Sequence, residues 1–456
     1  MVIRMRIIYV ILCILFVSSS ISYGYEQVPE DAKVKKEDVS KEVIENQAPE
    51  AKSRLGKNTI ANLSGNGAEE TNVVLVDKSL KRLYIARLKG NDMEVLEEFP
   101  ILTGRVDGNK IKRGDEKTPE GVYYVLSYSS GDELVKRYGD YALIYGAGSF
   151  PLNYPNMVDR IEKKTGGGIW LHGVKPDLDK TYTQGCVAMN NTHFNTLFKN
   201  IKVTTPTIIA EKLMYTDEYN YESTKSKVEK AFNDFMTAWE KNNKKSFQDA
   251  VHTNFKTPGG TLKKAYTATK TYLMDIYPQK DIRNMNTKYF IKDEKYAVVD
   301  TEQFYCAPNL TTFTNKRYYF IDENGSLKLI SEEVRSKPVT SASFLDNEIK
   351  AFVNNWASSW KSQDIDKYME NYDLTFKSGR DNYLKWKEKK SAIFAKNIPV
   401  TLNISNIKWY YSKGVYTVEF MQEYSSGSVK DKGIKTLKLS GCPAFFKIKS
   451  ETWRGI

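Results

Sequence analysis

The chain has 456 residues, 41% of them hydrophobic, and a formal net charge of +12 at pH 7. This length is too great for one ordinary core, and the negative mean hydropathy excludes a protein with many membrane spans. The basic excess suits an anionic partner such as a cell wall or a membrane surface, or equally a lysine-rich solvated surface. Zinc-finger and RNA-recognition signatures are absent from the sequence, so we expect no nucleic acid as a partner.

The first strongly apolar run lies at the very start of the chain. Arg4 and Arg6 precede the apolar stretch from Ile7 to Val17, and small residues follow up to Gly24. This order is typical of a secretory signal peptide over residues 1–24. An uncleaved anchor is the alternative, and it would then be the only contact with a membrane. We therefore expect an exported protein of the periplasm or cell envelope.

Three cysteines remain after the signal peptide: Cys186, Cys306 and Cys442. This odd number fits no disulfide framework, and the sequence leaves open whether Cys306 and Cys442 pair. At least one thiol is left over in either case. An unpaired cysteine in an oxidising compartment is a hazard unless it is buried or used chemically, so the surroundings of each cysteine decide its role.

Residues 25–70 are rich in Glu, Lys, Ala, Ser, Asn and Gly and lack apolar periodicity, which predicts a flexible or weakly helical tether. Order is expected to begin with two β-rich runs at 72–77 and 82–86, joined by a short polar turn as in a hairpin. Further strand-like runs lie at 121–126, 168–171 and 207–210. Together these runs predict a mainly β domain over residues 71–213.

After this domain, two stretches resemble each other at an offset of 121 residues. The aligned residues are Val228, Phe232, Phe235, Trp239, Phe247, Val251 and Phe255 in the first, and Ile349, Val353, Trp356, Trp360, Tyr368, Tyr372 and Phe376 in the second. Their three- and four-residue spacing predicts amphipathic helices, and Tyr-rich strand signals follow in both stretches. We expect tandem α+β domains over residues 222–336 and 342–456.

Helices followed by an antiparallel sheet resemble the SnoaL-like cone fold, also called the NTF2-like fold. Members of that fold hold a ligand pocket or are catalytically silent, and neither copy shows a set of acid and base residues in its sequence. We interpret the Trp and Phe stripes as core rather than as a binding site. The expected ligand of these domains is an anionic glycan or a protein.

The chemistry is concentrated between Gly166 and Asn191. His172, one of three histidines in the chain, lies 14 residues before Cys186. The apolar run 169–171 predicts a strand that delivers His172 at its end. A thiol nucleophile needs a nearby base because the thiolate is the reactive form, and His172 is the candidate for this base. The alternative is that Cys186 is merely a small buried residue.

Three backbone groups are predicted to support this pair. The carbonyl of Gly173 is placed to orient His172 by accepting the other ring N–H. The N–H groups of Gly185 and Cys186 are expected to stabilise an oxyanion. The remaining histidines, His193 and His252, are assigned structural places, and the absence of any Cys/His cluster predicts no metal site and no cofactor.

These motifs resemble the signature of YkuD-type L,D-transpeptidases. The resemblance rests on His172-Gly173, the spacing of 14 residues and Thr183-Gln184-Gly185-Cys186, with further agreement at Thr103-Gly104-Arg105 and in the Thr-Pro-x-Gly segment 118–121. It implies a cysteine acyl transferase of peptidoglycan, with Thr183, Gln184 and Tyr154 at the substrate. The chain departs from the usual pattern at Gln184, where His is common, and at Ala188, where Arg is common.

The resemblance implies attack on the L,D bond of a tetrapeptide stem, release of D-Ala and transfer of the acyl group. Transfer to an amine of another stem makes the enzyme an L,D-transpeptidase, whereas transfer to water makes it an L,D-carboxypeptidase. One branch of the family, with a SnoaL-like C-terminal domain, trims stems in helical bacteria and affects cell shape. Another branch hydrolyses lipoprotein–peptidoglycan links. A non-catalytic cell-wall-binding protein is the alternative of another class.

Overall fold

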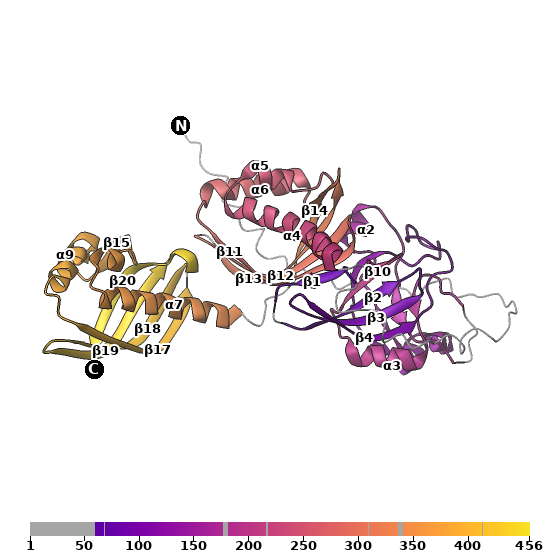
Figure 1. Ribbon diagram of the computed structural model, residues 1–456, viewed down its shortest axis with the longest axis horizontal. Coiled ribbons are helices and arrows are strands. Elements are labelled where there is room, and N and C mark those ends of the chain that lie inside the picture. The colour runs from indigo at the N-terminus through magenta and orange to yellow at the C-terminus, as the bar shows by residue number, and fades with distance from the viewer. Residues whose placement is uncertain are drawn as a thin grey trace, which may run out of the picture.

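The computed structural model describes residues 60–456 except 68, 177–180, 216–217, 309, 336–340 and 413. The predicted signal peptide and most of the predicted tether lie outside the described residues. Within them the chain forms a first unit (60–215), a second unit (218–335) and a third unit (341–456), with the second between the other two (Figure 1). None of the helices in these described segments is long and apolar enough to cross a membrane.

The first unit is built around two β-sheets. Its elements are β2 (Thr71–Asp77), β3 (Arg82–Lys89), β4 (Asp92–Pro100), β5 (Gly121–Tyr124), β6 (Ser129–Ser130), α1 (Gly131–Tyr138), the 3-10 helix η2 (Asp140–Tyr145), β7 (Gly148–Pro151), α2 (Met157–Ile161), β8 (Trp170–His172), β9 (Val187–Ala188), α3 (Asn191–Asn200) and β10 (Pro206–Ala210). The larger sheet has the order β4-β3-β2-β10-β5, and the smaller has the order β6-β7-β8-β9. Each predicted strand run of this unit overlaps an observed strand.

Strand β2 is buried on both faces, which explains its continuous apolar sequence. Because side chains alternate along a strand, Val74 and Val76 point to one side and Val73 and Leu75 to the other. The first pair packs with residues of the smaller sheet and of α3. The second pair packs with residues of the second unit, so one core joins the two units. The large sheet therefore lies between the core of the first unit and the core that the first and second units share.

The prediction of a tether up to residue 70 is wrong for its last part. Ile60 is fully buried, and strand β1 (Leu63–Gly65) pairs antiparallel with a strand of the second unit. The side chain of Asn62 donates to the carbonyl of Ile291 at 2.7 Å. A three-residue strand with the sequence Leu-Ser-Gly has no periodicity of its own, so only the sheet that it joins makes it ordered.

The second unit has three helices followed by a long antiparallel sheet. Its elements are α4 (Glu218–Glu240), α5 (Lys244–Asp249), α6 (Lys263–Ile276), β11 (Asp281–Asp293), β12 (Tyr296–Ala307), β13 (Leu310–Glu323) and β14 (Ser326–Val334). The sheet has the order β1-β11-β12-β13-β14. The aromatic stripe of α4, at Phe232, Phe235 and Trp239, lies in the core of this unit, as the spacing predicts.

The third unit has a similar plan of helices and a long antiparallel sheet. Its elements are α7 (Ser341–Lys361), α8 (Ile365–Met369), β15 (Tyr372–Ser378), β16 (Asp381–Asn382), α9 (Tyr383–Phe394), β17 (Val400–Ser412), β18 (Val415–Ser426), β19 (Val429–Ser440), the 3-10 helix η3 (Pro443–Phe445) and β20 (Lys447–Gly455). Its sheet has the order β16-β15-β20-β19-β18-β17. Helix α7 lies against this sheet (Figure 1), and Trp356 and Trp360 of α7 are buried.

A disulfide bond joins the second and third units. Cys306 at the end of β12 and Cys442 before η3 are bonded, with 5.7 Å between their Cα atoms. Both cysteines are buried in a small cluster with Phe304 and Phe313. The pairing that the sequence left open is therefore present, and Cys186 is the cysteine of the described residues that forms no disulfide.

Candidate active site

The register of the small sheet places Cys186 and His172 on the same side. In the parallel pair β8–β9, Leu171 lies opposite Val187 and His172 lies opposite Ala188. Cys186 comes two residues before Ala188, so its side chain points to the same face as those of Ala188 and His172. The register therefore puts the two side chains on the same face of the small sheet, although the two residues are 14 positions apart in sequence.

His172 is held in a defined orientation. Its ring is buried, and its Nδ1 lies 2.5 Å from the carbonyl oxygen of Gly173. The edge-on ring of Tyr145 packs against it, with 5.0 Å between the ring centroids. A carbonyl can only accept, so Nδ1 carries the proton, and the lone pair of the neutral ring lies on Nε2. This is the orienting contact predicted for Gly173.

The thiol of Cys186 lies half-buried among aromatic side chains. It packs against a cluster formed by Leu134, Ala142, Tyr145 and Trp170. Its Sγ is 3.4 Å from the carbonyl oxygen of Gly168, which accepts the S–H. Burial, and then the negative charge of a thiolate at Cys186, raise the pKa of Tyr145 above its usual value. A partly exposed thiol beside an oriented imidazole is suited to nucleophilic attack.

Thr183 holds the loop that carries the thiol. Its Oγ1 donates to the carbonyl of Cys186 at 2.7 Å and accepts the N–H of Gly185 at 3.1 Å. Gly185 has a φ of +129°, and a Cβ there would lie 2.9 Å from the carbonyl oxygen of Lys117. Glycine is therefore required at this position. The N–H of Gly185 is engaged inside the turn, which weakens its predicted part in an oxyanion hole.

The nucleophile loop is also tied to the preceding Thr-Gly-Arg segment. The N–H of Thr183 donates to the carbonyl of Thr103, and the N–H of Arg105 donates to the carbonyl of Thr183, at 2.8 and 2.9 Å. Gly104 lies against the backbone of Thr118, whose Oγ1 accepts its N–H at 2.8 Å. The motifs of the predicted YkuD signature are thus in direct contact.

The predicted substrate residues differ in their surroundings. Gln184 is exposed at the loop tip. Tyr154 is 6% exposed in the core, and its hydroxyl donates to the carbonyl of Thr165 at 3.3 Å. Ala188 is fully buried and exchanges both backbone hydrogen bonds with Leu102. The structure therefore gives Tyr154 a packing role and Thr183 a turn role, and their contact with substrate stays a prediction, as it does for Gln184.

Two family models match the chain. The L,D-transpeptidase catalytic domain, YkuD, matches residues 71–209, and the Cds6 C-terminal NTF2-like domain matches residues 348–452. The chain carries a YkuD L,D-transpeptidase catalytic domain. An NTF2-like domain follows in its C-terminal region, so the predicted fold class is confirmed at this level. The assignment of residues 222–336 to the same NTF2-like fold stays a prediction, which their order of helices and strands supports.

Solved structures resemble this YkuD protein over most of their own length. Bd1075 of Bdellovibrio bacteriovorus is 25% identical, and the match covers 63% of this chain and all of that one, with a TM-score of 0.55. The K307A mutant of Pgp2 of Campylobacter jejuni, described as a helical cell shape determining protein, is 21% identical. That match covers 61% of this chain and 94% of Pgp2, with a TM-score of 0.50. No curated protein sequence matches the chain.

Reasoning from the sequence assigned no role to two residues that lie beside the nucleophile loop or His172. Tyr145 touches Trp170 as well as His172, with 4.8 Å between the Tyr145 and Trp170 centroids. The guanidinium of Arg105 pairs with Glu116 and lies 5.7 Å from the ring of Tyr182, beside the nucleophile loop. The Thr-Gly-Arg motif pointed to Arg105, but Tyr145 precedes His172 by 27 positions and carries no local signal.

The other two histidines lie in packing positions. The ring of His193 stacks on Phe99 with 4.9 Å between centroids, and the backbone N–H of His193 donates to the side chain of the helix cap Asn190. His252 is 7% exposed, and its Nδ1 accepts the N–H of Asn254. Burial lowers the pKa of both rings. These contacts agree with the structural places that the sequence suggested.

The C-terminal units contain buried charges that the sequence reading overlooked. Lys435 and Glu451 form an ion pair at 2.7 Å with both side chains buried, and Lys316 and Glu332 lie 3.9 Å apart at the equivalent positions. Lys390 lies over Trp360 as Lys270 lies over Trp239, at 3.9 and 4.7 Å. These groups meet only across the folded sheet and helices, and the expectation that neither copy holds a set of acid and base residues for catalysis stays a prediction.

Proposed function

We propose that this protein is an exported acyl transferase of peptidoglycan that acts on the L,D bond of tetrapeptide stems through an acyl-enzyme on Cys186. The observation that supports the proposal is an imidazole oriented by Gly173, on the same face of the small sheet as a cysteine outside any disulfide, in a YkuD domain. The family models support a peptidoglycan-modifying enzyme, and the residues and reaction are our proposal.

In the proposed first half-reaction, Nε2 of His172 takes the proton of the Cys186 thiol, and Sγ attacks the carbonyl carbon of the L,D bond. The tetrahedral oxyanion forms near the backbone N–H of Cys186. The carbon–nitrogen bond then breaks, and the imidazolium returns its proton to the leaving amine of D-Ala. The products are a thioester on Cys186 and free D-Ala.

The acceptor in the second half-reaction decides whether the enzyme is a transpeptidase or a carboxypeptidase. An amine of another stem attacks the thioester in an L,D-transpeptidase, whereas water attacks in an L,D-carboxypeptidase; His172 takes the proton of either acceptor and returns it to the sulfur. The fold shared with a helical cell shape determining protein favours stem trimming as the second candidate. A lipoprotein-linked stem is the third possible donor.

The disulfide bond of the chain supports export. The buried disulfide Cys306–Cys442 is typical of an oxidising compartment, and disulfides are rare in cytosolic proteins. We propose the periplasm or cell envelope as the site of action, in agreement with the signal peptide predicted over residues 1–24.

Product masses separate these reactions. Purified protein is incubated with tetrapeptide muropeptides, and separately with lipoprotein-linked muropeptides. Loss of D-Ala with gain of water identifies a carboxypeptidase, cross-linked dimers identify a transpeptidase, and release of lipoprotein peptide identifies the third activity. Absence of every product would leave a wall-binding protein and contradict the proposal.

A further inference from the structure

Helix α9 of the third unit lies at one end of the molecule. Figure 1 shows it at the end away from the catalytic domain, with the second unit between them. Strand β15 pairs with β16 directly before this helix, and the ring of Phe376 in β15 packs on Trp386 of α9 with 5.5 Å between centroids. One face of α9 is therefore held against the unit, and the opposite face is turned to solvent.

The outward face of α9 is basic. Lys385 and Lys389 are four residues apart, so they share one face of the helix, and Lys396 follows seven residues later, just past the helix end. All three are exposed, whereas Lys390 on the opposite face is buried. The one acid of α9 is Glu388. The outward face thus carries a clear excess of positive charge.

Most of the cations at this end of the molecule have no counter-charge. Lys377 and Arg380 are exposed in the β15–β16 hairpin that leads into α9. Within the described residues, Lys389 pairs with Asp381 at 2.5 Å, whereas Lys377, Arg380, Lys385 and Lys396 pair with no acid. Clustered cations without counter-charges create a positive potential that attracts an anionic surface.

Aliphatic side chains protrude among these cations. Leu374 in β15 is 80% exposed, and Leu384 in the first turn of α9 is 72% exposed. Ile393 and Ile398 are exposed as well. Leu384 and Ile393 are nine residues apart, which puts them at the two edges of the outward face. A lysine-rich face that only meets water needs no such residues, whereas a helix that lies on an anionic membrane combines both kinds.

We propose that the end of the third unit formed by β15, β16 and α9 docks on the surface of an anionic phospholipid bilayer. Its unpaired cations contact the lipid phosphates, and Leu374 and Leu384 enter the boundary between headgroups and acyl chains. A hydrated polymer of glycan and peptide offers no apolar phase for these leucines, which favours lipid as the partner.

Docking at this end also sets the place of the catalytic domain. The disulfide Cys306–Cys442 and the buried aromatic cluster around it fix the third unit to the second. The second unit shares a core with the first. A bilayer bound at α9 therefore leaves the YkuD domain at the opposite end of the molecule, away from the lipid (Figure 1). The proposal does not depend on which reaction the enzyme catalyses.

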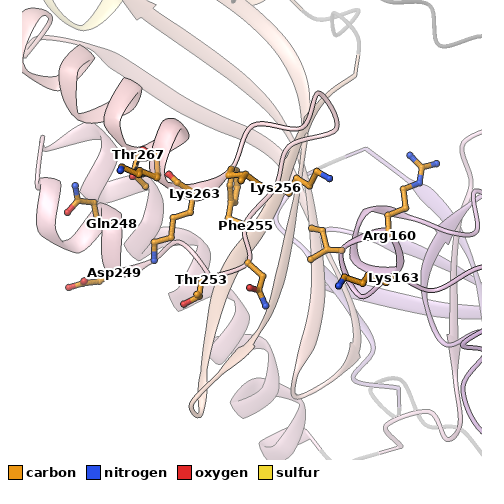
Figure 2. A pocket seen from close by; sticks show the side chains of 13 residues that line it. Arg160, Lys163, Gln248, Asp249, Thr253, Phe255, Lys256, Lys263 and Thr267 are labelled. Atoms are coloured by element: carbon orange, nitrogen blue, oxygen red, sulfur yellow. Dashed lines mark hydrogen bonds between the residues drawn. The ribbon is translucent and has the colours of Figure 1, made fainter.

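The test compares two triple variants that remove the same charge. The docking variant is Lys377→Gln/Lys385→Gln/Lys396→Gln. The control is Lys163→Gln/Lys256→Gln/Lys264→Gln, whose lysines line a hollow of about 940 Å³ between the first and second units (Figure 2). These lysines are also exposed, but a flat bilayer cannot enter a hollow.

Binding is measured by co-sedimentation with vesicles of phosphatidylglycerol and phosphatidylethanolamine, and with vesicles of phosphatidylcholine alone. The protein begins at Tyr25, so that the apolar stretch of the predicted signal peptide does not itself enter the vesicles. We expect the unchanged protein to prefer the anionic vesicles. Binding by the docking variant should fall at least about tenfold, and binding by the control should change little.

A second pair of variants tests the aliphatic residues. Leu374→Ser/Leu384→Ser should weaken binding to anionic vesicles about threefold or more, whereas Leu80→Ser/Leu262→Ser, at exposed leucines of the first and second units, should not. Melting temperatures of all variants show that each one is folded.

Three results would overturn the proposal. The first is equal binding of the unchanged protein to both kinds of vesicle, or no binding to either. The second is an equal loss of vesicle binding in the docking variant and its control. The third is a docking variant that keeps its vesicle binding and loses binding to purified sacculi, because this surface would then belong to the wall polymer.

Discussion

The hydroxyl of Thr183 makes both hydrogen bonds that shape the turn before Cys186. We predict that Thr183→Val lowers kcat on the tetrapeptide by about 10- to 100-fold, because the loss of two hydrogen bonds of roughly 1 kcal/mol or more each misplaces the thiol. Thr183→Ser keeps the oxygen and should retain most of the activity. Steady-state kinetics of the three proteins check this.

The serine variant is the matched control for that change. A valine variant with unimpaired kcat would show that the turn does not position the sulfur. Loss of activity in both variants would mean that the methyl group is needed in addition to the hydrogen bonds.

Asp115 holds together the loop that precedes the Thr-Pro-x-Gly segment. Burial alone would raise its pKa, but the ion pair with Lys110 and the N–H groups of Lys112, Ile111 and Lys117 lower the pKa to about 2. The pKa in the folded protein lies below the usual value of 3.8 for an aspartate, so the stabilisation is present above pH 4 and is lost as the pH falls toward 2.

We therefore predict that Asp115→Asn lowers the free energy of unfolding by about 1–2 kcal/mol at pH 7 and by clearly less at pH 3. Urea unfolding of the wild type and the variant at both pH values measures the difference. An equal loss at the two pH values would mean that the carboxylate charge is not what stabilises the loop.

At the scale of single residues, the sequence predicts candidate catalytic residues where these stand close together in the chain. His172, Gly173 and Cys186 stand within 15 residues of one another, and the contact expected between His172 and the carbonyl of Gly173 is present. The pairing of Cys186 with His172 stays a prediction that the register of the small sheet supports. The engagement of the Gly185 N–H by Thr183 depends on the turn geometry, and the contact of Tyr145 with His172 depends on a distant segment. Neither follows from residue types and spacing.

Among the elements, the adjacent strands β19 and β20 carry a buried ion pair. We predict that Glu451→Gln lowers the stability of the third unit by about 3–5 kcal/mol, because it leaves Lys435, which is 4% exposed, without its counter-charge. The hydroxyl of Tyr372 also donates to Glu451 at 2.7 Å and would lose part of that bond. Thermal and urea unfolding of the full chain give the change.

An exposed pair in the same sheet is the control. Lys432 and Glu423 are 2.6 Å apart, with side chains 58% and 48% exposed, so Glu423→Gln should cost less than about 1 kcal/mol. If the two variants lose equal stability, burial does not set the strength of the Lys435–Glu451 pair.

The repeated ion pairs of the second and third units were not predicted from the sequence. Helices and strands of both C-terminal units follow from apolar spacing, but Lys435 and Glu451 are separated by a turn and meet through sheet register. Lys316 and Glu332 lie 119 residues before Lys435 and Glu451, whereas the apolar residues of the helices repeat at an offset of 121. Aligning the helices therefore does not by itself match these charged residues.

Across the whole molecule, the disulfide fixes the third unit to the second. We predict that Cys306→Ser/Cys442→Ser lowers the unfolding free energy by about 2–4 kcal/mol, because the bond closes a long loop in the unfolded chain. Reductant should lower the melting temperature of the wild type and leave that of the variant unchanged. A reductant effect of equal size in both proteins would contradict this account. Both proteins are measured with Cys186→Ala as well, so that the Cys186 thiol cannot exchange with the disulfide.

The sequence predicts the order of the domains but not their assembly. The units can be predicted from the sequence because their signals are local. These signals are the hairpin, the β-rich runs and the aromatic stripes, each of which lies within a few residues. The shared core on the outer face of β2 and the added strand β1 are contacts between units. A strand buried on both faces has the same apolar sequence whether a helix, a sheet or another domain covers it.

The central claim is that Cys186 carries the acyl group. The most direct test is the intact mass of the protein after brief incubation with tetrapeptide muropeptide and acid quenching. The account predicts a mass increase equal to the muropeptide minus D-Ala, located by peptide mapping on Cys186, lost under hydroxylamine and absent from Cys186→Ala. Product formation by Cys186→Ala at the wild-type rate, or an adduct on another residue, would contradict it.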